Sequence, residues 1–307
     1  MDFRGLDLNL LVILDALFTE RSVTRGGERV RLSQSATSTA LSRLRDYFQD
    51  ELLVQVGHRM VLTPHAEGLV EPVRDLLLRA ESITKHNTNF DPATAVRTFR
   101  LRMSDYAATV LLPGFVPALR KLAPGVTLDI QSNLHMPVES LERGEIDLLI
   151  MPQQFMSKSH PSEVLFEDGY VCVVWSENKL VKNRISLAQY LAMGHAAVKF
   201  SDMASPVLED WFASQFGQRR RIEVISMAFT LLPQLVAGTD LIATMHERLA
   251  RKYAKLFPLR LIPPPMQIPT LTECVQWHKY HDFDPGILWL RRLLAQSVAE
   301  PPKRSRA

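Results

Sequence analysis

The stretch that decides the fold of the N-terminal part is residues 21–45, RSVTRGGERVRLSQSATSTALSRLR. Its second half has the pattern of a helix, and Ser33 can cap that helix because its hydroxyl can accept from amide groups of the first turn. Helical spacing places four apolar residues on one face: Ala36, Ala40, Leu41 and Leu44. A shorter helical pattern precedes Ser33, so the stretch predicts a helix-turn-helix.

The other face of this helix carries small hydrogen-bonding side chains: Gln34, Ser35, Ser38, Thr39 and Ser42. Arg43 and Arg45 stand beside them. Amide side chains can pair with adenine, hydroxyls can meet either base, and arginine can meet phosphate or guanine. An ordinary solvated face is the alternative, but such a face usually carries more Glu and Lys. The composition therefore favours a helix that reads DNA.

Further elements of a DNA-binding head flank this helix. Residues 6–20 and 24–30 have the patterns of two helices. Residues 52–62 alternate around Gly57, which predicts a two-stranded wing or another surface hairpin. The candidate DNA-binding residues are Thr24, Arg25, Ser33, Gln34, Ser35, Ser38, Thr39, Ser42, Arg43, His58 and Arg59.

Length and charge set the broad class of the protein. The 307 residues suggest two or three domains. The net charge of +3, from 36 basic and 33 acidic residues, does not by itself indicate a nucleic-acid binder. The local balance is more informative, because residues 21–59 hold seven arginines against four acidic residues. This modest positive charge suits a DNA-binding head.

Cysteine usage and the first residues indicate the compartment. Cys172 and Cys274 each lie in an apolar run without a partner motif, which favours reduced, buried thiols. The chain begins MDFR and lacks the basic segment and cleavage site of a signal peptide. The apolar run at 8–18 is too short to span a membrane. We therefore expect a cytoplasmic protein with no membrane partner.

Residues 64–86 have the pattern of one long helix. Apolar residues recur along it at alternating steps of three and four, at Ala66, Leu69, Val73, Leu76, Ala80 and Ile83. Such a repeat favours pairing with a second helix. Pro72 should remove one hydrogen bond and bend the helix. We expect a dimer seam, and packing against its own chain is the alternative.

The rest of the chain alternates between strands and helices. A loop rich in turn-forming residues at 87–98 marks a domain boundary. The βαβ rhythm that follows predicts parallel sheets covered by helices. A second set of strands and helices runs from 165 to 261, and the prolines at 263–265 force an extended connector. A strand at 271–277 and a helix at 285–299 complete the domain.

These segments together resemble the LysR-type transcriptional regulators. In the N-terminal part the resemblance is carried by Leu6-Asp7-Leu8-Asn9-Leu10-Leu11, Leu32-Ser33-Gln34-Ser35-Ala36 and Leu62-Thr63-Pro64. Later segments resemble the nodulation-gene activators and their aromatic-acid-sensing relatives. These are His160-Pro161, Val171-Cys172-Val173, Gly194-His195, Val198-Lys199-Phe200, Arg220-Arg221-Ile222-Glu223-Val224, Gly238-Thr239-Asp240, Ile242-Ala243-Thr244-Met245 and Val275-Gln276-Trp277-His278.

The resemblance implies an N-terminal winged helix-turn-helix and a long linker helix, followed by an α/β two-lobed effector domain of the periplasmic-binding-protein type. It also implies a homodimer that pairs into a homotetramer, double-stranded promoter DNA as a partner, and contact with RNA polymerase. We expect a DNA-binding domain at 1–63, a linker helix at 64–90, an effector domain at 91–300 and a disordered basic tail at 301–307. Within the effector domain, the first lobe is expected at 91–162 and 268–300, and the second lobe at 163–267.

Some residues of the head depart from the family pattern. Gly26 and Gly27 stand in the second helix where paired alanines are usual, and a glycine in a helix costs about 1 kcal/mol relative to alanine. Ser35 replaces a usual proline, and Thr37 stands where a β-branched apolar residue is common. We expect these departures to weaken the head without changing its fold.

A ligand cleft is expected beyond the carboxyl ends of the effector strands. Ser104 and Asp105 open a helix there, and they either favour a carboxylate or phenolate or simply cap the helix. Lys199 could pair with such a ligand and Phe200 could stack on it, whereas a single tryptophan such as Trp277 is usually part of a core. The candidate ligand-binding residues are Ser104, Asp105, Thr109, Pro152, Gly169, Lys199, Phe200, Ser201, Gln276 and Trp277, among which Thr109, Pro152 and Gly169 come from the resemblance.

No pattern of enzyme chemistry accompanies the cleft. The histidines have no metal-ligand spacing, and His278 and His281 are better explained as part of a polar loop. No nucleophile elbow or phosphate-binding glycine loop occurs. We therefore expect no enzymatic activity, no cofactor and no metal. The predicted function is a ligand-responsive transcription regulator, an activator that senses a small aromatic effector such as a phenol, flavonoid or aromatic acid. The alternative is a two-lobed binding protein or enzyme with a vestigial DNA-binding head.

Overall fold

The computed structural model describes residues 7–57, 59–84, 89–133, 136–199 and 208–298. The chain divides into two compact units, residues 1–86 and 87–307. His58, Phe200, Ser201 and the tail at 301–307 lie outside the described residues. Within the described ranges, no helix is both long and apolar enough to cross a lipid bilayer.

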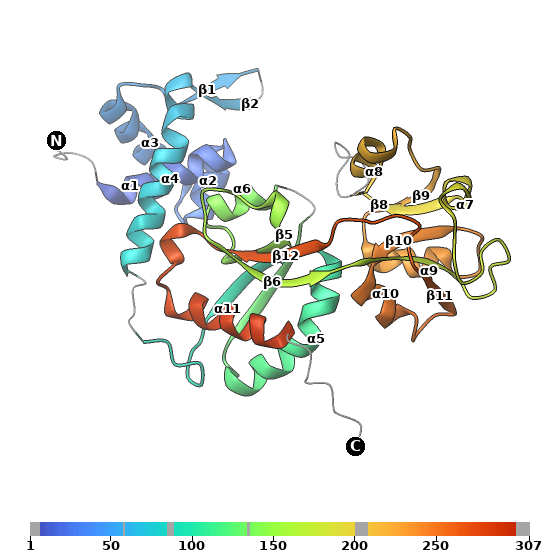
Figure 1. Cartoon of the computed structure of the whole chain (residues 1–307). Helices are drawn as coiled ribbons and strands as arrows, with labels where there is room; N and C mark the ends of the chain where they lie inside the picture. The colour runs from blue at the N-terminus through green and yellow to red at the C-terminus, as the bar shows by residue number, and fades with distance from the viewer. Residues whose placement is uncertain (1–6, 58, 85–88, 134–135, 200–207, 299–307) are drawn as a thin grey trace. The chain divides into compact units, whose positions relative to one another are not determined.

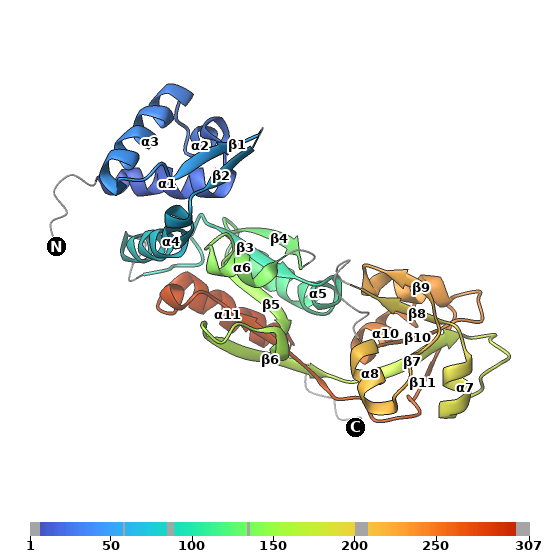
Figure 2. The same ribbon diagram turned by 90° about the horizontal axis from the view of Figure 1, so that it is seen from above.

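The first unit is a group of helices with a two-stranded hairpin (Figure 2). Short polar side chains cap its first three helices: Asp7 accepts from the amide of Asn9, Ser22 from that of Arg25, and Ser33 from that of Ala36. The predicted helices and the two-stranded hairpin are confirmed. The elements are α1 (Leu8–Glu20), α2 (Val23–Arg29), α3 (Gln34–Phe48), β1 (Leu53–Val56) paired antiparallel with β2 (Arg59–Leu62), and α4 (Pro64–Thr84).

The buried face of α3 is displaced from the predicted one. Ala40 and its apolar neighbours are buried as expected, but Ala36 is exposed and Thr37 is fully buried. Thr37 satisfies its hydroxyl by donating to the backbone oxygen of Ser33 at 2.9 Å, which permits a polar residue at this position. A Cβ atom on Gly27 of α2 would come within 2.5 Å of the Thr37 Oγ1 atom. The glycine therefore makes room for the threonine.

The apolar seam of α4 lies in two environments. Ala66 and Val73 are buried in the core of the first unit, and Leu69 packs against that core. The alternative of packing on its own chain is therefore correct for this half of the helix. Further along, Leu76 is 44% exposed and Ile83 is 75% exposed. This second half leaves apolar surface open to a partner.

The second unit contains two five-stranded sheets, and the first sheet defines a first lobe. Its strand order is β4-β3-β5-β12-β6. Helices α5 and α11 pack against each other beside it (Figure 1). The elements of this lobe are β3 (Thr98–Met103), α5 (Asp105–Leu122), β4 (Thr127–Ser132), α6 (Pro137–Glu142), β5 (Leu148–Pro152), the 3-10 turn η1 (Gln153–Phe155), β6 (Ser162–Asp168), β12 (Leu271–Gln276), the 3-10 turn η3 (Lys279–His281) and α11 (Pro285–Val298).

The second sheet defines a second lobe and has the order β11-β7-β10-β8-β9. It is built entirely from residues between β6 and β12 of the first sheet. Its elements are β7 (Tyr170–Trp175), α7 (Leu187–Ala192), β8 (His195–Val198), α8 (Glu209–Phe216), β9 (Ile222–Ser226), the 3-10 turn η2 (Phe229–Leu231), α9 (Leu232–Val236), β10 (Ile242–His246), α10 (Glu247–Tyr253) and β11 (Leu259–Ile262). The two-lobed α/β architecture is thus confirmed.

The strand pairing corrects two details of the prediction. Each sheet is parallel only in part, because β12 runs antiparallel to both β5 and β6, and β7 runs antiparallel to β10 and β11. Strand β6 pairs with β12, so the first crossover between lobes comes at Gly169, at the end of β6. The predicted start of the second lobe at 163 is too early. The return crossover lies between Ile262 and Leu271.

Candidate functional site

The predicted polar face of α3 is exposed to solvent. Three of its hydroxyl groups also make hydrogen bonds within α3 and its cap. The Ser33 and Ser35 hydroxyl oxygens lie 3.0 Å apart, and the Thr39 hydroxyl donates to the Ser35 backbone oxygen. The predicted DNA-binding residues that the structure describes are all exposed: Thr24, Arg25, Ser33, Gln34, Ser35, Ser38, Thr39, Ser42, Arg43 and Arg59. Amide, hydroxyl and guanidinium groups are thus presented together from one helix and its surroundings.

The arginines of this head have different roles. Arg45 donates from Nε to the backbone oxygen of Glu51 and from Nη2 to that of Leu53, both at 2.8 Å. It therefore holds the hairpin against α3. Arg25 donates to the Glu20 backbone oxygen at 2.7 Å and ion-pairs with the Glu20 carboxylate. Arg43 lies exposed beside the polar face and can reach a phosphate.

A cavity of about 540 Å³ lies between the two lobes of the second unit. Its volume falls within the range of small-molecule sites, which are usually apolar with a few polar groups. The lining residues are Ser104, Tyr106, Asn133, Pro137, Met151, Pro152, Gln154, Phe155, Tyr170, Leu208, Asp210, Trp211, Phe229, His246, Ile268, Pro269, Thr270, Leu271 and Glu273. Aromatic rings and aliphatic side chains make up most of this wall.

Two of the predicted ligand-binding residues line this cavity, Ser104 and Pro152. Ser104 also caps α5, because its hydroxyl accepts from the Ala107 amide at 3.1 Å. The two interpretations of Ser104, as a cap and as part of the cleft, are therefore compatible.

Asp105 and Thr109 hold the lobes together instead of facing the cavity. The Asp105 carboxylate accepts from the Thr230 amide at 2.8 Å and from its hydroxyl at 2.7 Å. The Thr109 backbone oxygen accepts from the Lys252 ammonium. Both contacts run from α5 to the second lobe, so these two residues are corrected from ligand contacts to lobe contacts.

Gln276 and Trp277 are also corrected, because both are buried in the protein itself. Gln276 is fully buried, and its amide group exchanges hydrogen bonds with the backbone of Ser157. Trp277 is 2% exposed and donates from its indole nitrogen to Asp282 at 3.0 Å. The guanidinium group of Arg291 lies 3.3 Å from the centre of its ring. Trp277 is therefore part of the core.

The last two described candidates do not line the cavity either. The Gly169 backbone oxygen accepts from the Glu247 amide at 2.9 Å, at the crossover between β6 and β7. The Lys199 amide donates to the Ser226 backbone oxygen, which continues the pairing of β8 with β9. Both lie at the end of a strand, and neither is among the residues that line the cavity.

Sequence reasoning missed three polar groups of the cavity wall, Tyr106, His246 and Glu273, and the Asp168 carboxylate next to them. Tyr106 donates to the Asp168 carboxylate at 2.7 Å. Its ring lies 4.1 Å from that of His246 and 5.9 Å from that of Phe229, measured between centroids. Glu273 lies on β12, opposite Phe166 of β6, while Asp168 lies opposite Leu271. Alternation along paired strands places Asp168 and Glu273 on the same face of the sheet.

Burial controls the charge of these groups. Glu273 is 1% exposed, and burial together with the charge of Asp168 raises the pKa of its carboxyl group to about 8. Burial also raises the pKa of Asp168 and lowers the pKa of the His246 ring to about 3. At neutral pH the Glu273 carboxyl group is therefore mostly protonated and the His246 ring is uncharged.

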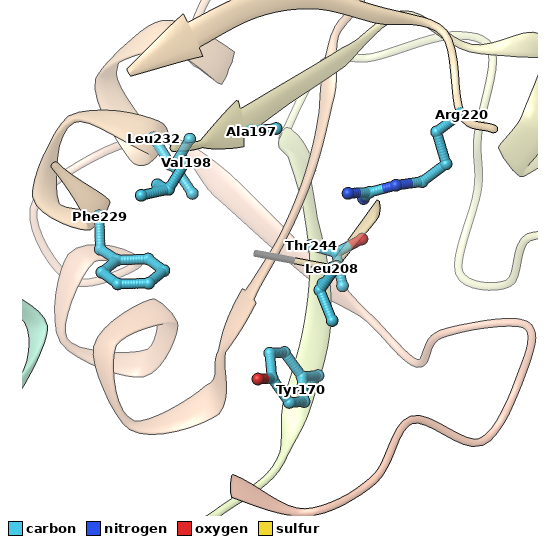
Figure 3. A pocket seen from close by; sticks show the side chains of 8 residues that line it. All are labelled: Tyr170, Ala197, Val198, Leu208, Arg220, Phe229, Leu232 and Thr244. Atoms are coloured by element: carbon cyan, nitrogen blue, oxygen red, sulfur yellow. The ribbon is translucent and has the colours of Figure 1, made fainter. Parts of the chain in front are cut away.

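A smaller cavity of about 20 Å³ lies in the second lobe, and Figure 3 shows the residues that line it. The two cavities share Tyr170, Leu208 and Phe229 in their walls. Arg220 lines the smaller one, but its guanidinium group is paired with Glu209 and donates to the Tyr190 hydroxyl at 2.9 Å. The space admits about one water molecule. Arg220 is not among the residues that line the larger cavity.

Comparison with known proteins decides the family. The model named "LysR substrate binding domain" matches residues 93–299, and the model named "Bacterial regulatory helix-turn-helix protein, lysR family" matches residues 8–67. The chain belongs to the LysR family of transcriptional regulators. These two matches correspond to the effector unit and the helical head of this LysR-family chain.

Full-length relatives support the same assignment. This LysR-family chain is 42% identical to nodulation protein D 1 of Bradyrhizobium diazoefficiens, over 100% of both chains. It is 43% identical to nodulation protein D 1 of Mesorhizobium japonicum, over 97% of this chain and 95% of that one.

Solved structures share its architecture. A probable transcriptional regulator from Pseudomonas aeruginosa, PA0477, is 32% identical, with a TM-score of 0.65 over 95% of this chain and 97% of that one. Full-length OxyR from the same organism has a TM-score of 0.71 over 95% of this chain and 94% of that one. At 18% identity, OxyR shows the fold alone.

Proposed function

We propose that this LysR-family regulator binds promoter DNA through α3 and responds to a small aromatic effector bound between its lobes. The observation that carries the proposal is the exposed set of amide, hydroxyl and guanidinium groups on α3. Side chains of these kinds read base edges and phosphates in a major groove. The relatives named nodulation protein D favour an activator, which would also contact RNA polymerase in the cytoplasm.

The exposed half of α4 supports a dimer. Leu76 and Ile83 lie on the predicted seam and are 44% and 75% exposed. A second copy of α4 would cover them and hold two copies of α3 at the spacing of two half-sites. A tetramer made from two such dimers is the assembly that the family resemblance implies.

The cavity wall supports an aromatic effector. Tyr106, Tyr170, Trp211 and Phe229 line it together with aliphatic side chains, and its volume of about 540 Å³ suits a ligand of two or three rings. Hydrogen bonds such as Asp105 to Thr230 join the lobes. An effector that binds one arrangement of the lobes more tightly shifts the population toward it, which is how it would reach the DNA.

The test is a fluorescence-anisotropy titration with promoter fragments at two salt concentrations. We expect Gln34→Ala and Ser38→Ala to lose about 1–3 kcal/mol of discrimination at individual base pairs. Arg43→Ala should weaken binding to all sequences and reduce the salt slope by about one. Gln234→Ala makes the same change on an exposed site of the second unit and serves as the control.

Unchanged sequence preference in all three α3 variants would show that another surface reads the DNA. Equal binding of the wild type to all fragments would favour the other candidate function, a small-molecule binding protein with a vestigial head. Titration with a dihydroxyflavone, with and without promoter DNA, then tests the effector half of the proposal.

A further inference from the structure

Glu273 is a buried acid for which the described part of the chain supplies no hydrogen-bond partner. It is 1% exposed and lines the cavity, yet neither of its carboxyl oxygens has a hydrogen-bond partner within the described part of the chain. An unsatisfied buried polar group costs about 1–3 kcal/mol. Such a group in a cavity wall indicates that something entering the cavity completes its hydrogen bonds.

Two further polar atoms of the cavity lining share this condition. The Nδ1 atom of His246 and the Oδ1 atom of Asn133 are buried and have no hydrogen-bond partner in the described ranges. The amide nitrogen of Asn133 is used, since it donates to the Ile150 backbone oxygen at 3.0 Å. The lining therefore offers unpaired polar atoms in a mostly apolar space, and hydroxyl groups on a ligand, which both donate and accept, would satisfy them.

The charges around Glu273 disfavour an anion. No lysine or arginine is among the described residues that line the cavity, whereas Asp210 and Glu273 both line it. Asp168 lies on the same sheet face as Glu273, and its carboxylate is already engaged by Tyr106 and by the Arg248 amide. The side chain of Arg248 lies over the Phe166 ring, outside the lining. An anionic ligand would thus lose its hydration without gaining a cation.

We propose that Glu273, with His246, reads hydroxyl groups on the effector and that the Glu273–Asp168 acid pair excludes anionic ligands. A protonated carboxyl group can donate one hydrogen bond and accept others, so it matches a hydroxyl or ketone oxygen. An ionised carboxylate beside Asp168 would add negative charge to the site. The selectivity is therefore for uncharged, hydroxylated aromatic compounds, and it rests on the proposed effector function.

The test uses three probes on the full-length protein, measured by isothermal titration calorimetry: flavone, a dihydroxyflavone, and a flavone with a carboxylate in place of a hydroxyl. At pH 6.5 we expect the dihydroxyflavone to bind at least tenfold more tightly than flavone. The carboxylate should bind at least a hundredfold more weakly than the dihydroxyflavone. Glu273→Leu should remove most of the preference for the dihydroxyflavone over flavone.

Measuring affinity over a range of pH distinguishes direct hydrogen bonding of Glu273 to the ligand from a purely structural role of this residue. Burial and the charge of Asp168 raise the pKa of Glu273 to about 8. Among the described residues, the other ionisable side chains of the cavity wall are Tyr106, Tyr170, Asp210 and His246, and the charged groups next to them are Asp168 and Arg248. The measured quantity is the ratio of the wild-type affinity to the Glu273→Gln affinity for the dihydroxyflavone. Ionisation of the dihydroxyflavone affects both affinities equally, so it does not change this ratio. We expect this ratio to fall about tenfold per pH unit above the pKa. Glu167→Gln, on an exposed acid of β6, is the matched control and should keep the wild-type profile.

Each outcome is decisive. If no probe binds at any pH, the aromatic-effector function itself is wrong. If the dihydroxyflavone binds but the carboxylate binds equally well, or the affinity ratio is flat with pH, the effector function stands and the role of Glu273 is refuted. Should Glu273→Gln fail to fold, the comparison of probes on the wild type still decides the exclusion of anions.

Discussion

Gly27→Ala is the sharpest test of how the head is packed. The added Cβ atom would lie 2.5 Å from the Thr37 Oγ1 atom and 3.0 Å from the Leu32 backbone oxygen. In an open helix this substitution stabilises by about 1 kcal/mol. Here the overlap forces a shift, and overpacking of a core costs about 1–3 kcal/mol. Because two contacts are too close, we take the upper end and expect a net loss of about 2 kcal/mol.

The partner of this glycine supplies a second, coupled change. Thr37→Ala alone removes a hydrogen bond to the Ser33 backbone and opens a small cavity, for a cost of about 1–2 kcal/mol. In the double variant the methyl group added at position 27 enters the space that Thr37 leaves. We therefore expect the double variant to lose less unfolding free energy than the sum of the two single losses, by about 1–3 kcal/mol.

Gly68→Ala on α4 is the matched control, because a Cβ atom there meets nothing within 4 Å. It should stabilise by about 1 kcal/mol through helix propensity alone. The same substitution, glycine to alanine, should therefore destabilise the protein at position 27 and stabilise it at position 68.

The assay is native-state hydrogen exchange of peptides from α2 and α3, followed by mass spectrometry, which gives a local opening free energy. All four tryptophans lie in the second unit, so tryptophan fluorescence checks independently that this unit is unchanged. Stabilisation by Gly27→Ala, or additivity in the double variant, would refute the packing argument.

Two further predictions concern the seam of α4 and the buried acid. Leu76→Asp and Ile83→Asp should convert the proposed dimer to a monomer in sedimentation velocity, because they place charge on its proposed apolar interface. A monomeric wild type would contradict this. For Glu273, a folded-state pKa raised to about 8 from an ordinary 4.5 means that stability is intact below pH 4.5 and is lost as pH rises toward 8. The stability of Glu273→Gln relative to the wild type should therefore be greater at pH 8 than at pH 5, by on the order of 3 kcal/mol. Calorimetry at the two pH values measures this difference. An equal difference at both pH values would show that Glu273 is ionised when folded.

Local patterns were sufficient to predict the helices and the hairpin of the head. A cap such as Ser33 and the periodic residues after it act within one or two turns, so no distant part of the chain is needed to recognise them. The same holds for the repeat on α4, whose spacing is visible in a single segment. Which neighbouring residue is buried was not predictable in this way. Thr37 rather than Ala36 enters the core, because Gly27 on another helix leaves room for it.

The effector unit shows the same division at larger scale. The alternation of strands and helices predicted an α/β fold, but the position of the first crossover depends on β6 pairing with β12, about a hundred residues away. Asp105 begins the helix that follows β3 and Gln276 ends β12, and such polar residues near the ends of strands are reasonable ligand candidates. Partners from other elements, such as Thr230, satisfy their hydrogen bonds instead.

The sequence by itself determined the family, the order of the elements and the chemistry of the recognition helix, because all three are written in short-range spacing and residue type. Tertiary structure alone decided the cavity. Tyr106, His246 and Glu273 come from α5, β10 and β12, and none of them belongs to a motif. One local sign was present, an acidic residue within the otherwise mostly apolar strand at 271–276. Whether such a group meets a partner, solvent or a cavity depends on which distant segments surround it, and only the folded chain determines that.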